Sequence, residues 1–313
     1  MQFLDWIVLC GTLLFIVVYG IIKSKKNKNI EDFVLNNTKT NWFTVGISVM
    51  ATQASAITFL STPGQAFHDG MGFVQFYFGL PLAMIVICIT FIPAYYKLKV
   101  YTAYQYLENR FDAKTRALAA VLFLVHRGLG TGLTIYASAI ILSSILGWNL
   151  NFLAILIGFL VLTYTMTGGA KALNVTQPQQ MMVVLTGMFL TFIAILIYLP
   201  DQLSFSNALG IAGANGKMNI VDTSFSPEKR YTIWSGIAGG FFLSLAYFGT
   251  DQSQVGRYLS GKSIEESQKG LIMNGLLKVP MQFFILLTGV MVFIFYQFYP
   301  SPYVYSKEHL NQH

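Results

Sequence analysis

Small and polar side chains gather in the middle of an apolar stretch that covers about residues 43–67. The polar members are Thr52, Gln53, Ser55 and Thr58, and a Pro63-Gly64 step follows them. A helix that is unwound at such a place has free backbone carbonyls, and free carbonyls at membrane depth can coordinate Na⁺. The same residues could instead form a small-residue face for close helix packing. The residue types alone leave both interpretations open.

Two basic side chains lie inside apolar stretches. Arg127 is ten residues into its stretch, next to His126, and Lys278 is seven residues into its own. A basic residue at the centre of a membrane helix costs about 2.5–3.5 kcal/mol on insertion scales, so it usually faces a cavity or a partner. A long side chain near a helix end can instead extend its charge to the surface. Both interpretations stay open for Arg127 and for Lys278.

Residue types that could support enzymatic chemistry are sparse. The chain holds four His and two Cys, with no Ser/His/Asp arrangement, no metal-ligand spacing and no phosphate-binding glycine loop in its sequence. An intramembrane enzyme would need paired acids or His within the apolar stretches. The nearest acids, Asp5, Asp69 and Asp251, lie close to the ends of these stretches. We therefore predict that the chain is not an enzyme and binds no nucleotide.

The composition indicates what positions these residues. Only 11% of the 313 residues are charged and 54% are hydrophobic, with a mean hydropathy of +0.56, whereas soluble domains carry about 25% charged residues. Eight stretches reach the roughly 20 residues that an apolar helix needs to cross a bilayer. They are approximately 3–22, 43–67, 72–96, 117–146, 150–168, 180–199, 232–250 and 271–298. The sequence predicts an all-α polytopic membrane protein with one transmembrane domain over 1–313, surrounded by lipid.

Lys and Arg alternate between the connections. Fourteen of the 20 fall in alternate loops, four in the opposite loops and two within apolar stretches. Since basic residues collect on the cytoplasmic side, we predict a cell (plasma or inner) membrane protein whose N-terminus is outside. The net charge of +7 then reflects topology and not a nucleic-acid partner. The first stretch has no basic region before it and no cleavage site after it, so we expect a retained span.

Four motifs occur in order along the chain. They are SVMATQASAITFLSTPGQAF (48–67), KLKVYTAYQYLENRFDAKTR (97–116), YTMTGGAKALNVTQPQQ (164–180) and AYFGTDQSQVGRYLSGKS (246–263). Together they resemble the sodium:solute symporter family, which includes the sodium/glucose, sodium/proline, sodium/iodide, sodium/multivitamin and sodium/sialate symporters. The resemblance runs from about Asp5 to about Tyr299. One motif alone would be weak evidence, whereas four in order are specific.

The resemblance implies a LeuT-like fold. Members of the family have a leading helix and a ten-helix core made of two inverted five-helix repeats. The first span here would be the leading helix, spans two to six the first repeat, and spans seven and eight the first two helices of the second repeat. The later core helices, which would follow Tyr299, are absent from the sequence. We therefore expect a truncated, N-terminal portion of such a bundle.

The resemblance also implies where the coupling ion, Na⁺, binds. In the family, backbone carbonyls of the broken first core helix and hydroxyls of the eighth core helix share the ion. The motif match places the carbonyls on Ala51 and Ala54, and the hydroxyls lie outside this chain. The family motif Thr-Asp-x-x-Gln has Gln177 in place of its acid. This departure argues against a second sodium site.

For the solute, the resemblance implies six substrate-binding positions. They are Ser55, Thr58, Tyr77, Ser244, Tyr247 and Lys278. Sugar symporters have an amide at the position of Thr58 and an acid at that of Tyr77, so the match does not favour a sugar. The sialate symporters resemble the chain at Ser55 and Thr58, but their substrate-pairing arginine falls at Gly130, about one turn from Arg127.

These expectations combine into one function. Inward movement of Na⁺ would drive uptake of a small polar organic solute, such as a sugar or an organic acid, by alternating access. The alternative is a transport-inactive membrane sensor on the same scaffold, which a signalling domain would favour.

Overall fold

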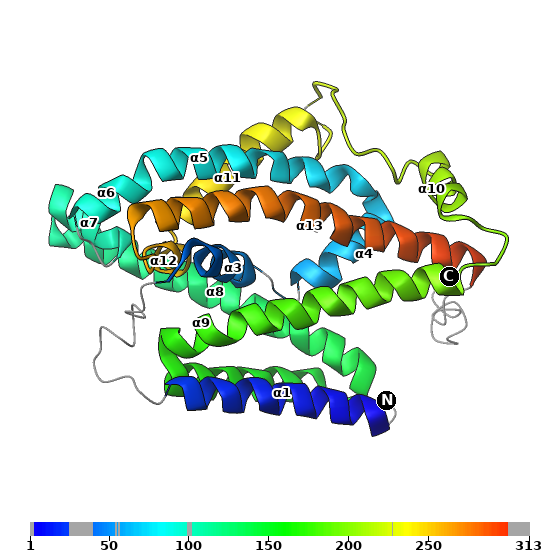
Figure 1. The fold of residues 1–313 in the computed structure, drawn as a ribbon, viewed down its shortest axis with the longest axis horizontal. Helices are drawn as coiled ribbons and strands as arrows, with labels where there is room; N and C mark the ends of the chain where they lie inside the picture. Colours follow the sequence, from blue (N-terminus) through cyan, green and yellow to red (C-terminus); the bar gives the residue numbers. More distant parts are fainter. Residues whose placement is uncertain are drawn as a thin grey trace. The chain divides into compact units, whose positions relative to one another are not determined.

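A computed structural model describes residues 3–24, 40–53, 55, 57–98, 102–226 and 228–299 of the chain. Within these ranges the regular structure is helical (Figure 1), and the β-type pairing described is one isolated bridge between Thr40 and Gly261. Helices are expected here because a membrane-spanning backbone must satisfy its hydrogen bonds internally. The predicted all-α architecture is confirmed.

The helices follow one another along the chain with short connections. In order they are α1 (Phe3–Ser24), α3 (Trp42–Thr52), the π-helix η1 (Ile57–Ser61), α4 (Thr62–Asp69), the 3₁₀-helix η2 (Met71–Phe78), α5 (Gly79–Ile89), α6 (Phe91–Leu98), α7 (Ala103–Arg110), α8 (Ala113–Leu146), α9 (Leu150–Tyr198), α10 (Phe205–Ala214), α11 (Ile233–Thr250), α12 (Gln252–Tyr258) and α13 (Ile264–Phe298).

Five helical stretches in the described part are long and apolar enough to cross a membrane. They are Met71–Leu98, Ala113–Leu146, Thr176–Tyr198, Ile233–Thr250 and Ile264–Phe298, and the interrupted pair Trp42–Thr52 and Ile57–Asp69 makes a sixth if it forms one span. The 49 residues of α9 would extend about 74 Å if straight, more than twice a hydrocarbon core of about 30 Å. The green ribbon of α9 accordingly changes direction sharply in Figure 1. The count of eight spans stays a prediction.

The helices form two compact units. The first comprises Met1–Thr58, Leu80–Val183 and Phe241–Leu277, and the second comprises Phe59–Gly79, Val184–Gly240 and Lys278–His313. The boundaries fall inside α9, α11 and α13, so no linker separates the units there. The single transmembrane domain over 1–313 stays a prediction.

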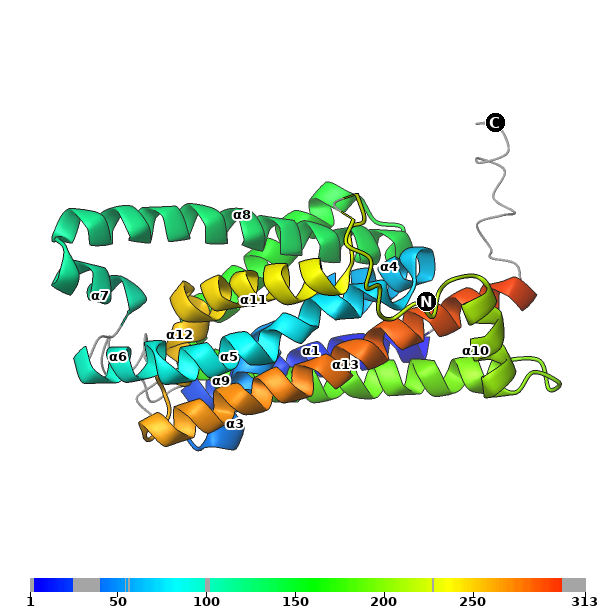
Figure 2. The same cartoon turned by 90° about the horizontal axis from the view of Figure 1, so that it is seen from above.

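In the first unit, the short helix α7 connects α6 to α8 (Figure 2). Thr102 and Gln105 form a reciprocal capping box at the start of α7, which satisfies two backbone donors at once. The carboxylate of Asp112 accepts a 2.7 Å hydrogen bond from the N–H of Thr115 at the start of α8. Hydrogen bonds from Thr115 lower the pKa of Asp112. The second sequence motif therefore encodes two adjacent helix starts.

An apolar core holds the second unit together. Its buried members come from α4, η2, α9, α10 and α13, and they are Ala66, Met71, Val74, Ile195, Leu199, Ala208, Ala212, Leu286, Val290, Met291 and Ile294. Beside this core, the rings of Phe189 and Phe284 stack with their centroids 4.5 Å apart. This packing fixes the second half of α13, which carries Lys278.

Glycines bring α11 against η2 within the second unit. A Cβ atom would lie 2.5 Å from the carbonyl oxygen of Gln75 at Gly236, and 2.0 Å from that of Phe76 at Gly240. These glycines are four residues apart, so they share one helix face. Small residues allow helix backbones to approach closely in membranes, and here the approach leaves no room for a methyl group.

We expect Gly240→Ala to destabilise the protein, because its methyl group would overlap the carbonyl of Phe76. Overpacking of this kind costs about 1–3 kcal/mol and would lower the melting temperature measured in detergent by size-exclusion chromatography with fluorescence detection. The matched control is Gly187→Ala on α9, where nothing lies within 4 Å of the added Cβ. Replacing a helix glycine there should be neutral or stabilising. Equal melting temperatures of the two variants would contradict this packing.

Candidate ion and solute site

The second predicted span is interrupted at its polar residues. Helix α3 ends at Thr52, and the next helix begins at Ile57. The backbone N–H of Gln53 turns back to the carbonyl of Met50 at 3.2 Å, and that of Ser55 donates to the carbonyl of Gln53 at 3.1 Å. These are short-range turn contacts and not the regular bonds of an α-helix. The predicted break is therefore present in the chain.

The predicted sodium ligands are the carbonyls of Ala51 and Ala54. Ala51 is buried in the last turn of α3, and its carbonyl accepts a bond from the N–H of Gln53. A carbonyl oxygen has two lone pairs, so it can also face a cation. Ala54 lies outside the described residues, and both assignments stay predictions.

The donor set at the break suits Na⁺ in its chemistry. It consists of backbone carbonyl, hydroxyl and amide oxygens, and hard cations prefer oxygen ligands. In the described ranges, no group of three or more His, Cys, Asp or Glu residues could hold a metal ion. The oxygens of the break are therefore neutral dipoles.

Two polar side chains connect the end of α3 to other helices of the first unit. The side-chain amide of Gln53 donates to the Oδ1 atom of Asn274 on α13 at 3.3 Å. The hydroxyl of Thr52 donates to the carbonyl of Ser48 at 2.7 Å and lies 3.4 Å from the Oε1 atom of Gln177 on α9. Gln177, which replaces the acid of the family motif, therefore lies at the break. Asn274 was missed by the sequence analysis, although an Asn in an apolar helix one turn before Lys278 was a usable signal.

Thr58 connects the two sides of the break. Its hydroxyl donates to the carbonyl of Gln53 at 2.9 Å, while Ser55, also half-buried, lies between the helices. The hydroxyl oxygen of Thr58 can still accept a hydrogen bond. Its predicted role toward the solute is compatible with this geometry and stays a prediction.

Ser244 and Tyr247, the predicted solute residues of α11, are both half-buried. The hydroxyl of Tyr247 accepts a 2.8 Å hydrogen bond from the side-chain amide of Gln254 on α12. Tyr247 also lines a cavity of about 810 Å³ between α6, α7, α8 and α11, together with His126 and Asp251. The cavity walls are mostly aromatic and aliphatic, so the few polar groups would orient any occupant.

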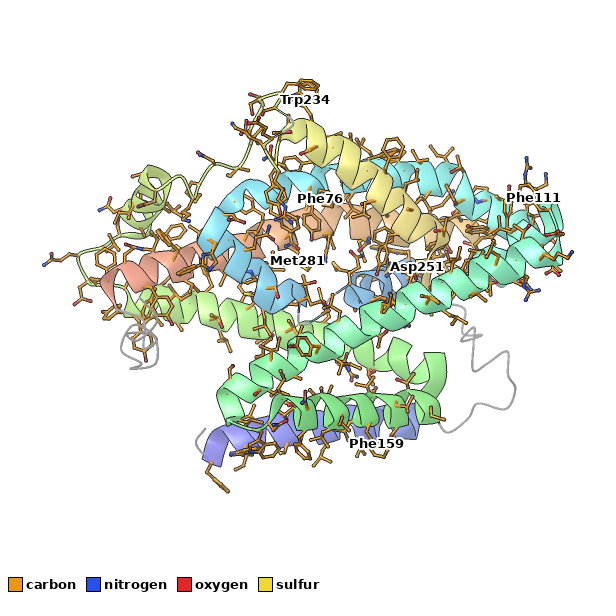
Figure 3. The ribbon with its side chains drawn as sticks, turned by 180° about the vertical axis from the view of Figure 1, so that it is seen from behind. Phe76, Phe111, Phe159, Trp234, Asp251 and Met281 are labelled. Carbon is orange, nitrogen blue, oxygen red and sulfur yellow. The ribbon has the colours of Figure 1, made fainter. Side chains whose placement is uncertain are left out.

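An ion pair joins α8 to the start of α12. The Nη1 atom of Arg127 is 3.8 Å from the Oδ2 atom of Asp251, whose side chain is only 8% exposed. Asp251, labelled in Figure 3 at the end of α11, also caps α12 by accepting the N–H of Ser253 at 2.8 Å. Arg127 therefore has a partner, as one of the two sequence interpretations requires.

Arg257 adds a second positive charge in this region. Burial and the nearby charge of Arg127 lower the pKa of Arg257 to about 10, so it stays protonated at neutral pH. Its buried Nη1 atom has no hydrogen-bond partner among the described residues. Two guanidinium groups thus accompany the single carboxylate of Asp251.

Lys278 and Tyr77 belong to the second unit. Lys278 is 2% exposed on α13, and the structure gives it no ion pair or hydrogen bond to any described residue. Such burial argues against a side chain that extends to the surface. The half-buried Tyr77 lies in η2 with its ring edge-on to Phe73, 5.6 Å between centroids.

Comparison with known proteins gives consistent relatives. The model of the sodium:solute symporter family matches residues 33–305. The sodium-coupled monocarboxylate transporter 2 of Mus musculus is 30% identical over 86% of this chain and 44% of its own length. The sodium/iodide cotransporter of Homo sapiens is 28% identical over 86% and 41%, and the sodium/sialic acid symporter SiaT of Proteus mirabilis is 29% identical over 96% and 60%.

A solved structure agrees with the fold. The substrate-bound, outward-open state of a Na⁺-coupled sialic acid symporter superposes with a TM-score of 0.87 at 27% identity, covering 96% of this chain and 62% of that chain. The LeuT-like arrangement is therefore confirmed for the part that the chain covers. The chain spans 41–60% of the length of the three curated relatives described above.

Thr58→Val should weaken Na⁺ binding, because it removes the hydroxyl that holds the Gln53 carbonyl across the break. A lost hydrogen bond of this kind costs about 0.5–1.5 kcal/mol, or roughly a 2- to 12-fold rise in the dissociation constant. The conservative variant Thr58→Ser keeps the donor and should bind Na⁺ normally in a radioactive sodium binding assay on the complete protein. Unchanged Na⁺ affinity in the Val variant would show that this hydroxyl does not support the ion site.

Asp251→Asn should separate the two roles of Asp251. Asn caps helices as well as Asp does, so α12 should persist, while Arg127 loses its counter-charge. We expect a loss of about 1–3 kcal/mol, between the values for exposed and for buried pairs, measured as a lower melting temperature. The matched control is Glu108→Gln, which breaks the pair of Glu108 with Arg116, whose side chains are 37% and 43% exposed, and should change little. If both variants melt alike, the Arg127–Asp251 pair contributes no more than a surface pair.

Proposed function

The chain belongs to the sodium:solute symporter family, and we propose that it belongs to a symporter in which Na⁺ entry drives solute uptake by alternating access. The observation that carries this proposal is the interrupted span, where Gln53, Ser55 and Thr58 lie between α3 and η1. Unwound backbone at membrane depth is tolerated where it lines a cavity, and such backbone coordinates Na⁺ in transporters. The carbonyls of Ala51 and Ala54 are the proposed ligands.

We propose a single Na⁺ site at this break. Gln177 contacts Thr52 at the end of α3, in the position where the family motif has an acid. An amide offers a neutral oxygen in place of a carboxylate, so it attracts a second cation much less. The ion at Ala51 would be held by dipoles alone.

The proposed solute is a small organic anion. The relatives are named for monocarboxylates, iodide and sialic acid, which are all anions at neutral pH. Lys278 supports the same choice, because it is a buried base without a described acidic partner. A buried charge in a membrane protein is expected to pair with an opposite charge, and an anionic solute would supply it. The proposed solute residues stay Ser55, Thr58, Tyr77, Ser244, Tyr247 and Lys278.

The proposed location is the cell membrane, with the N-terminus outside. The alternation of Lys and Arg between connections supports this orientation. The relatives are named as transporters and symporters, and no observation favours the membrane sensor, so we do not propose it.

The complete protein in proteoliposomes should take up at least one anion from a panel of lactate, iodide and N-acetylneuraminate when an inward Na⁺ gradient is imposed. Uptake should stop when choline replaces Na⁺ or when an ionophore collapses the gradient, and it should need no ATP. The control solute is glucose, which we expect to enter poorly. Equal uptake of every solute in Na⁺ and in choline would overturn the proposed symport.

A further inference from the structure

Gln282 is a buried amide without a partner. It lies on α13, one helical turn after Lys278, and is 0% exposed. Neither its Nε2 nor its Oε1 atom has a hydrogen-bond partner in the described part of the chain. Buried polar groups in proteins are nearly always hydrogen-bonded, so this side chain needs an explanation.

The other buried polar residues of α13 do have partners. Ser267 lies 2.8 Å from the hydroxyl of Tyr96. Asn274 accepts from Gln53, and Thr288 donates to the carbonyl of Phe284 at 2.9 Å. Lys278 and Gln282 are therefore exceptions on this helix, and they are adjacent. Their shared feature is polar capacity that the described fold leaves unused.

We propose that Lys278 and Gln282 together bind the carboxylate group of the transported solute, and that Gln282 makes the site specific for carboxylates. This inference rests on the proposed function and names the solute class more narrowly. Gln282 is a further solute-binding residue that the sequence analysis did not single out.

The spacing of the two side chains suits this ligand. Residues four apart on a helix are neighbours on one face, about 6 Å apart along the axis. Figure 3 labels Met281, which immediately precedes Gln282 on α13. Lys278 offers three ammonium donors and Gln282 two amide donors, while a carboxylate offers two acceptor oxygens. One oxygen can thus meet the ammonium and the other the amide.

The chemistry also separates solute classes. A neutral solute would leave the charge of Lys278 uncompensated in a buried position, which is unfavourable. A spherical anion such as iodide would compensate the charge but could not engage both donors with two separate oxygens. A carboxylate does both, so it fits this pair better than a sugar or a halide.

The test uses the complete protein in proteoliposomes, with lactate, N-acetylneuraminate, iodide and glucose as probes. Gln282→Leu should raise the KM for carboxylates at least tenfold, leave Na⁺ affinity unchanged, and leave the melting temperature the same or higher. The melting temperature should not fall, because the variant removes an unpaired buried amide. Gln282→Glu should abolish carboxylate uptake, since its own carboxylate would pair with Lys278 four residues earlier. The matched control is Thr288→Val, a buried polar residue of the same helix with a local partner, which should transport normally.

The outcomes distinguish this inference from the proposed function. Unchanged Na⁺-dependent carboxylate uptake in Gln282→Leu, or Na⁺-dependent uptake of glucose or iodide but not of carboxylates, would overturn the inference and leave symport intact. Loss of uptake together with a lower melting temperature in Gln282→Leu would assign Gln282 a structural role and overturn the inference too. Uptake that is independent of Na⁺ for all probes would overturn the proposed function, and the inference with it.

Discussion

The rest of the structure depends on one constraint, which is that a membrane-spanning chain must satisfy its backbone hydrogen bonds without water. A break in a span is therefore unfavourable unless other groups replace the lost helical bonds. At the break after α3, the hydroxyl of Thr58 reaches the carbonyl of Gln53, and the side chain of Gln53 reaches Asn274 on α13. The polar residues of this span are thus explained first as supports of the break. The carbonyls that remain free are then available to an ion.

The charge distribution at the break follows from the same arrangement. Helix α3 ends there, and the C-terminal end of a helix carries about half a negative charge. Gln177 adds a neutral amide beside Thr52. A cation at Ala51 would therefore be attracted by a helix end and by carbonyl dipoles and not by a carboxylate. This favours one monovalent ion over a divalent ion, whose dehydration needs stronger ligands.

The sequence was sufficient for the fold class and the position of the break, because hydropathy and the run from Thr52 to Thr58 report directly on the membrane and on backbone irregularity. It was less informative about side-chain partners. Arg127 finds Asp251 across 124 positions of the chain, and no spacing rule relates residues that meet only through tertiary packing. The polar face of α13 was half visible: Lys278 stood out by its charge, whereas Asn274 and Gln282 were hidden as single amides in an apolar helix.

The contrast between these two amides shows how structure separates support from function. Both are buried and lie on α13, eight residues apart, so composition and burial do not distinguish them. Asn274 has its hydrogen bond with Gln53 and stabilises the fold that holds the break. Gln282 has no such bond and destabilises the described state, because an unpaired buried amide loses its hydration without replacement. A residue that lowers stability is retained where a function needs it. The cost that remains at Gln282 is therefore the physical reason to look there for a ligand.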